Sequence, residues 1–169
     1  MRIKISGAMA ALVFAAPLQA GAPDSVWRFD DGDSSLDGAW CAASVDGWMP
    51  RGESSASLSV DYVEGLLTVN VAADDPVNGL VLAVYRDFRP TWKGRLRAVH
   101  PTTPERAVVG WDESPDALVT ALAAGDIATV ETDPVPGERL PPVYAFSLKS
   151  SSAAVAQVLG CRDGQNPRT

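Results

Sequence analysis

The residues best suited to chemistry lie between positions 86 and 97, where five basic side chains surround two aromatic ones. Arginine pairs with carboxylates and phosphates through parallel hydrogen bonds, and aromatic side chains anchor many interfaces. If segments 80–85 and 95–99 form a hairpin, the intervening loop caps it. The alternative is a charged hairpin tip whose arginines pair with the many acidic residues. We predict that the binding residues are Arg86, Phe88, Arg89, Trp92, Lys93 and Arg95.

Catalytic motifs are not evident elsewhere. His100 is the sole histidine and falls at a strand end before Pro101, so we expect a half-buried structural residue. The sequence has no G-x-S-x-G elbow, H-E-x-x-H pair or phosphate loop. The 21 acidic residues supply many carboxylate pairs, but sequence does not show which pairs have the separation that glycoside cleavage needs. We therefore expect no catalytic residue and no cofactor.

One acidic stretch has the spacing of calcium ligands, with Asp31, Asp33 and Ser35 at alternate positions. An EF-hand loop also needs Gly at its sixth position and Glu at its twelfth. Leu36 and Ala42 occupy those positions. We therefore interpret the stretch as a solvated acidic turn and predict no metal site.

The N-terminus has the three parts of a secretory signal peptide. Residues 1–4 are basic, residues 5–16 are apolar, and Pro17 precedes small residues at the exit. The apolar run is too short to span a bilayer as a helix. We expect cleavage near Ala20, a periplasmic or secreted protein, and no membrane span.

The charge balance is acidic. The chain has 14 basic and 21 acidic residues, a net charge of −7. Removal of residues 1–20, which include Arg2 and Lys4, moves the net charge to near −9. Such a balance argues against nucleic acid and against anionic membrane surfaces, because both are bound through basic patches. It is compatible with a cationic partner, although solubility alone explains it more often. We expect a monomer.

The two cysteines, Cys41 and Cys161, lie near opposite ends of the expected domain. An even count in an oxidising compartment favours a disulfide. We predict that the bond ties the first structured segment to the last helix. Free thiols or a reactive pair are the alternatives, although a redox C-x-x-C motif is absent.

Hydrophobic periodicity predicts a mainly β fold. Alternating or continuous apolar runs indicate seven short strands. Ser114 and Ser150–Ser152 are typical of helix starts, and Gly125 and Gly160 are expected to end the two helices. This pattern favours a single-domain β-sandwich or open barrel with two short helices. The expected organisation is a signal peptide at 1–20, an irregular lead-in at 21–39, a β-rich domain at 40–162 and a flexible tail at 163–169. Residues 26–29 are a candidate for a further strand within the lead-in. The expected strands are 57–63, 67–71, 80–85, 95–99, 107–111, 127–131 and 143–148.

The C-terminal segment Phe146-Ser147-Leu148-Lys149, with Ala153-Ala154 and Leu159-Gly160-Cys161 after it, resembles the end of a group of proteobacterial periplasmic proteins. The best-known members are of the invasion-associated locus B type, and Trp40-Cys41 is similar to their early Trp and Cys. The resemblance implies an all-β periplasmic domain without recognised catalytic residues, linked in some bacteria to host-cell association.

We therefore expect a non-enzymatic exported domain that binds a protein or an envelope component. One alternative is an acidic inhibitor or immunity protein that blocks a cationic enzyme through charge complementarity, using the acidic stretches 30–37 and 74–75. The other is a carboxylate-based hydrolase of envelope sugars or peptides.

Overall fold

The computed structural model describes residues 26–34, 38–49, 55–63, 65–73, 79–97, 106–108, 115–132 and 143–164. The expected signal peptide, His100 and the last five residues lie outside these ranges. In chain order the described elements are β1 (Arg28–Ser34), β2 (Gly38–Trp48), β3 (Ser55–Val63), β4 (Leu66–Ala73), β5 (Gly79–Arg86), β6 (Arg89–Arg97), β7 (Arg106–Val108), α1 (Pro115–Ala124), β8 (Ile127–Thr132), β9 (Val143–Ser147) and α2 (Ser151–Arg162).

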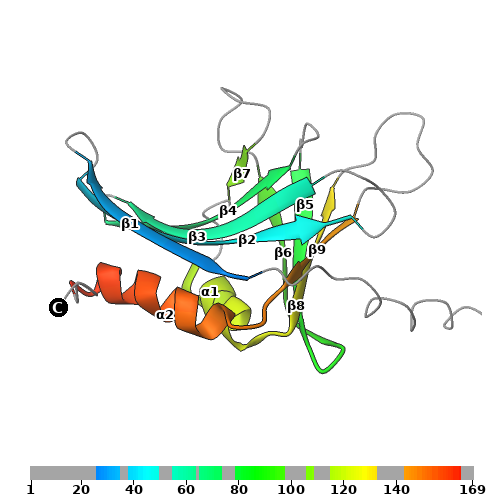
Figure 1. Ribbon diagram of the computed structural model, residues 1–169. Coiled ribbons are helices and arrows are strands. Elements are labelled where there is room, and N and C mark those ends of the chain that lie inside the picture. Colours follow the sequence, from blue (N-terminus) through cyan, green and yellow to red (C-terminus); the bar gives the residue numbers. More distant parts are fainter. Residues whose placement is uncertain are drawn as a thin grey trace, which may run out of the picture.

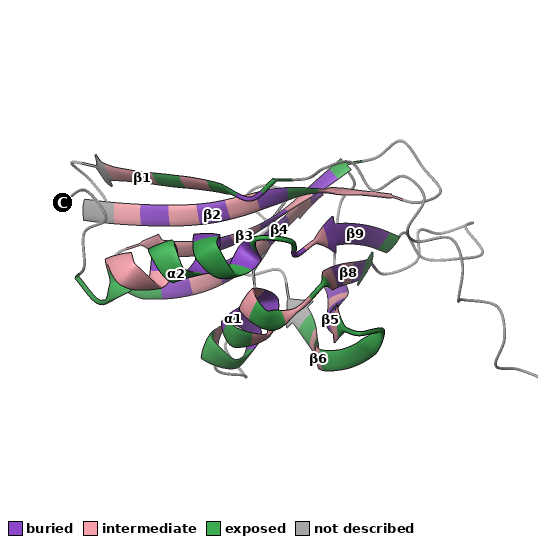
Figure 2. Ribbon diagram, turned by 60° about the horizontal axis from the view of Figure 1, so that its bottom comes forward, coloured by how far each residue is buried: buried purple, intermediate pink, exposed green. Residues whose placement is uncertain are grey.

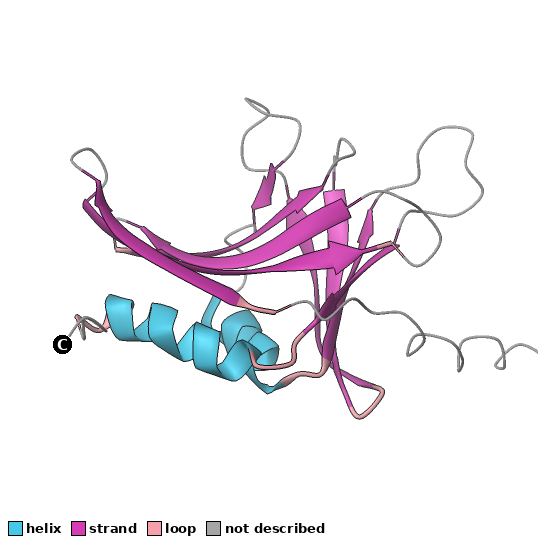
Figure 3. Cartoon of the chain, viewed as in Figure 1, coloured by secondary structure: helices cyan, strands magenta, loops and turns pink. Residues whose placement is uncertain are grey.

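The nine described strands form one antiparallel sheet in the order β1-β2-β3-β4-β7-β6-β5-β8-β9. β2 also pairs with β9, through Trp48 and Ala145, so the sheet curls back on itself at this corner. The result is a half-barrel (Figures 1 and 3). The prediction of a mainly β fold with two short helices is confirmed, and the single curved sheet has the form of an open barrel.

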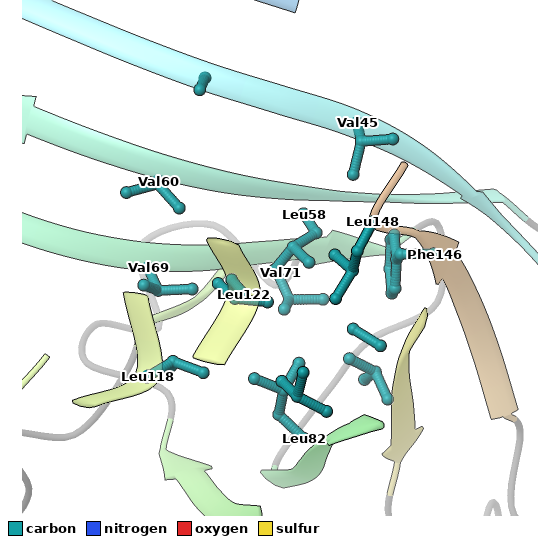
Figure 4. Close-up of a cluster of buried hydrophobic side chains, with 14 of the residues drawn as sticks. Val45, Leu58, Val60, Val69, Val71, Leu82, Leu118, Leu122, Phe146 and Leu148 are labelled. Carbon is teal, nitrogen blue, oxygen red and sulfur yellow. The ribbon is translucent and has the colours of Figure 1, made fainter. Parts of the chain in front are cut away.

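The core fills the concave side of the half-barrel. In β3 and β4, Leu58, Val60, Val69 and Val71 are buried, and the residues between them are more exposed. This alternation places one apolar face toward the interior, because successive strand side chains point to opposite sides. Helices α1 and α2 lie against that face (Figures 1 and 3). Figure 4 shows Leu118 and Leu122 of α1 among the apolar side chains of the sheet.

The small residues of β2 allow close packing at the corner where the sheet closes. A Cβ atom on Gly47 would overlap the ring of Phe146 in β9. Ala43, four residues earlier on the same strand, is completely buried. A side chain at position 47 would collide with Phe146, so the glycine there is a packing requirement.

The start of α2 is bonded to α1 and has no side-chain cap of its own. Ser150 lies before the helix with φ of 68°, and its side chain makes no capping hydrogen bond, contrary to the expectation for this serine run. Instead the buried hydroxyl of Ser151 donates to the carbonyl of Leu122 at 2.8 Å. This bond satisfies one of the carbonyls that the last turn of α1 leaves without an intrahelical partner. α2 also continues past Gly160, which was predicted to end it.

The C-terminal turn of α2 is fixed at two points. Cys161 forms the predicted disulfide with Cys41 of β2, with 6.4 Å between the Cα atoms. Next to it, Arg162 Nη1 lies 2.9 Å from Asp116 Oδ1 of α1, and Arg162 Nε lies 3.1 Å from Asp163 Oδ1. The hydrogen bond with Asp163 raises the pKa of Arg162. The last helix is therefore tied both to the sheet and to α1.

The segment 21–39 was expected to be an irregular lead-in with room for a short strand at 26–29, and its described part is mostly strand. β1 pairs with β2 residue for residue from Arg28 with Ser44 to Ser34 with Gly38. β1 is an edge strand rich in Asp, Gly and Ser, so it carries little of the hydrophobic periodicity that indicates a strand.

The described start of the expected flexible tail is also ordered. Asp163 and Gly164 close a hydrogen-bonded turn against the end of α2.

Candidate binding site

The predicted binding segment forms a tight β-hairpin, and the expected loop is absent. β5 ends at Arg86 and β6 begins at Arg89, and these two residues pair across the hairpin. Only Asp87 and Phe88 make the turn. The second strand of the hairpin was predicted at 95–99, so most of the expected loop is strand β6. We call the four residues from Arg86 to Arg89 the hairpin tip.

The turn has an unusual residue in a left-handed position. Asp87 has φ of 49° and Phe88 has φ of 60°, as in a type I′ turn, where Asn-Gly is the favoured pair. In the neighbouring β3–β4 hairpin, the positive φ of 84° falls on Gly65. A left-handed residue with a Cβ costs roughly 1–2 kcal/mol, and a bulky one is rare there. The fold therefore holds Phe88 in a conformation that a glycine would adopt more readily.

The side chains of the hairpin tip point into solvent. Phe88 is 90% exposed, the highest value among the large hydrophobic residues that the structure describes. Arg86 and Arg89 are also exposed. Within the described ranges neither these arginines nor Lys93 forms an ion pair. Figures 1 and 2 show the β5–β6 turn projecting beyond the body of the fold.

Asp126, in the connection between α1 and β8, fixes the turn to the rest of the protein. Its carboxylate accepts a hydrogen bond from the Asp87 backbone N–H, with 2.7 Å between Asp87 N and Asp126 Oδ2. Its own N–H donates to the Tyr85 carbonyl at 2.8 Å, and its carbonyl accepts from the Leu148 N–H at 3.0 Å. Sequence inspection did not single out Asp126, because the residue that its side chain binds is 39 positions away.

Replacing Asp126 with alanine is expected to loosen the turn while the fold persists. Loss of this charge-assisted bond should lower the free energy of unfolding by about 1 kcal/mol. The Asp87 amide should exchange its hydrogen measurably faster. Asp126→Asn keeps an acceptor and is the matched control. Equal exchange at Asp87 in the alanine and asparagine variants would contradict the role assigned to the carboxylate.

The structure separates Trp92 from the exposed members of the predicted site. Tyr85 pairs with Pro90 and Val84 with Trp92, so Thr91 is bulged, and its hydroxyl donates to the Val84 carbonyl at 3.2 Å. This shift places Trp92 on the same face as buried Val84, where it packs against the core. Trp92 therefore positions the hairpin and is not part of its exposed surface.

Lys93 and Arg95 lie on the outer face of β6, where charged side chains can protect an unpaired sheet edge. β6 pairs with β5 along its length but with β7 only at Arg97, so much of its other side is a sheet edge among the described strands. Lysine, proline and a bulge on an edge strand prevent pairing with another chain. Arg95 also has an interaction partner already. The predicted site thus reduces to Arg86, Phe88 and Arg89, with Lys93 behind them.

The described ranges contain no group of three or more His, Cys, Asp or Glu side chains placed to hold a metal ion. Asp31, from the calcium-like stretch, lies within strand β1 and pairs with Cys41. None of the described helices is long and apolar enough to cross a membrane.

Comparisons with protein-family models, with curated proteins and with solved structures gave no significant match. The resemblance of the C-terminal segment to the invasion-associated locus B type therefore stays a prediction. The hairpin tip presents the exposed side chain of Phe88 next to the cross-strand pair of Arg86 and Arg89.

Proposed function

We propose that this protein is an exported, non-enzymatic binding domain that contacts a protein or an envelope component through the hairpin tip. The observation that carries the proposal is Phe88, which is 90% exposed and has a positive φ. Exposure gives the ring no packing energy in the isolated protein, and the backbone conformation is costly for it. Strained residues that the surrounding structure holds in place cluster at functional sites.

The rigidity of the tip suits a binding role. Asp126 holds the turn through its hydrogen bond to the Asp87 N–H, and Trp92 packs β6 against the core. An anchor that is already ordered loses little conformational entropy on binding, so more of the contact energy appears as affinity. Arg86 and Arg89 flank the ring and add donors for anionic groups on the partner. Aromatic and arginine side chains are the residues most enriched at binding hot spots.

Export belongs to the same proposal. The predicted signal peptide directs the chain out of the cytoplasm, and a disulfide between Cys41 and Cys161 is stable in an oxidising compartment. Membership of the invasion-associated locus B type would add a link to host-cell association. The periplasm or the cell exterior is therefore the compartment in which a partner should be sought.

The test is photo-crosslinking from the tip. A photoreactive phenylalanine analogue at position 88 is compared with the same analogue at position 66, where Leu66 is 42% exposed beside the β3–β4 turn. In envelope preparations we expect one dominant product at position 88 and not at 66. Its yield should fall at least severalfold when Arg86 and Arg89 are both alanine. The same products at both positions would overturn the proposal. Trp92 is left unchanged, because its loss would disturb the core.

A further inference from the structure

We infer that the envelope component bound by the hairpin tip is an anionic phospholipid surface; this inference rests on the proposed function. The tip is convex and places its most apolar side chain at the apex, with cations directly behind it. A bilayer surface has the complementary order, with anionic phosphates outside and hydrocarbon beneath. A protruding aromatic residue enters that boundary without needing a pocket in a partner.

The spacing along the hairpin fits this layering. Each strand residue advances about 3.3 Å along the hairpin. Arg86 and Arg89 therefore lie one residue behind the turn, and Lys93 lies about four residues farther from it. Amphipathic elements bury their apolar side about 5–10 Å into the headgroup and acyl boundary. With Phe88 at that depth, the two guanidinium groups lie at the level of the phosphates, which arginine binds through paired hydrogen bonds.

The charge distribution of the protein determines which side of it faces an anionic membrane. The total charge of −7 argues against an anionic surface for the protein as a whole. At the tip, however, the two cations Arg86 and Arg89 outnumber the exposed acid Asp87, and the Asp126 carboxylate lies behind the turn, where it accepts the Asp87 N–H. Charges farther than about 8 Å from the surface are largely screened at physiological salt. The protein therefore contacts the membrane through the hairpin tip, and the acidic rest of the protein faces away from the membrane.

The experiment measures co-sedimentation of the oxidised, exported protein with vesicles of phosphatidylcholine alone and of an equal mixture with phosphatidylglycerol. We expect roughly tenfold stronger partition into the anionic vesicles. Phe88→Ala should lose about fivefold to tenfold of that partition, and Arg86→Ala with Arg89→Ala a similar amount. Leu66→Ala is the matched control and should not change it. All variants share the N-terminal residues, so any contribution of that segment cancels.

A second measurement locates the contact. Paramagnetic lipid in the anionic vesicles should broaden the amide signals of residues 86–89 in the unmodified protein and leave Gly65 and Leu66 sharp. Equal partition of wild type and Phe88→Ala, or broadening centred elsewhere, would overturn the lipid inference. If the vesicles do not bind but position 88 still crosslinks to a protein, the lipid inference fails and the proposed function stands. If position 88 gives no specific product and the vesicles do not bind, both fail.

Discussion

Replacing Cys41 and Cys161 together by alanine is expected to lower the free energy of unfolding by about 4–5 kcal/mol. The disulfide joins residues 120 positions apart, and closing so long a loop removes much of the entropy of the unfolded chain. It also holds the last turn of α2 over β2, where the helix covers the concave face of the sheet. Alanine is preferred to serine because Cys41 is only 5% exposed and a hydroxyl there would need a partner.

Urea unfolding of the oxidised protein and of the double variant measures this effect. Reduced wild-type protein is the control, and it should have the same stability as the double variant. A loss of less than about 1 kcal/mol would show that the α2–sheet contacts hold the helix without the covalent link, and the loop-closure account would be wrong.

Phe88→Gly is expected to change stability and binding in opposite directions. Glycine adopts a φ of 60° without steric cost, although it adds entropy to the unfolded chain. The net result should be a gain of about 0.5–1 kcal/mol in the free energy of unfolding. Partition into anionic vesicles or capture of a protein partner should fall about tenfold or more, because the apolar anchor is gone.

The matched control for that variant is Gly65→Ala, at the positive φ of the β3–β4 turn. It should lower stability by about 1 kcal/mol and leave binding unchanged. If Phe88→Gly destabilises the protein, the ring contributes to folding and the argument that it is retained for binding fails. If stability rises and binding does not fall, the tip is not the contact surface.

Much of the fold follows from local sequence patterns. The alternation of apolar residues placed β3 and β4 within a few residues, and the continuous apolar run placed β5. α1 was predicted from its Ser-Pro-Asp start and terminal glycine. These elements bury one regular face, so periodicity alone identifies them.

Two elements, β2 and the start of β6, were missed or misplaced. β2 has glycine at position 47 because the ring of Phe146 lies close to it, and its small residues interrupt the apolar alternation that indicates a strand. The start of β6 was assigned to a loop because Pro90 and the bulge at Thr91 interrupt the alternation. The first departure arises from packing between segments far apart in the chain, and the second from the local geometry of the β5–β6 hairpin.

The candidate site was predicted in part. The basic and aromatic composition of residues 86–95 located the segment, but composition does not show which side chains point outward. The bulge turns Trp92 into the core, and the turn presents Phe88 at the apex. Asp126 could not be found from sequence, since its role depends on hydrogen bonds to Tyr85 and Asp87 that form only in the folded sheet.

The central claim is that this domain makes contact through the hairpin tip. The most direct test is to record the amide spectrum of the isotopically labelled, oxidised protein while native envelope vesicles, with their lipids and proteins, are added. The account predicts that the signals of residues 86–89 broaden or shift first, followed by Lys93, while those of Gly65 and Leu66 are unchanged. Changes centred on the acidic residues Asp30 and Asp46, or spread evenly over the sheet, would contradict it.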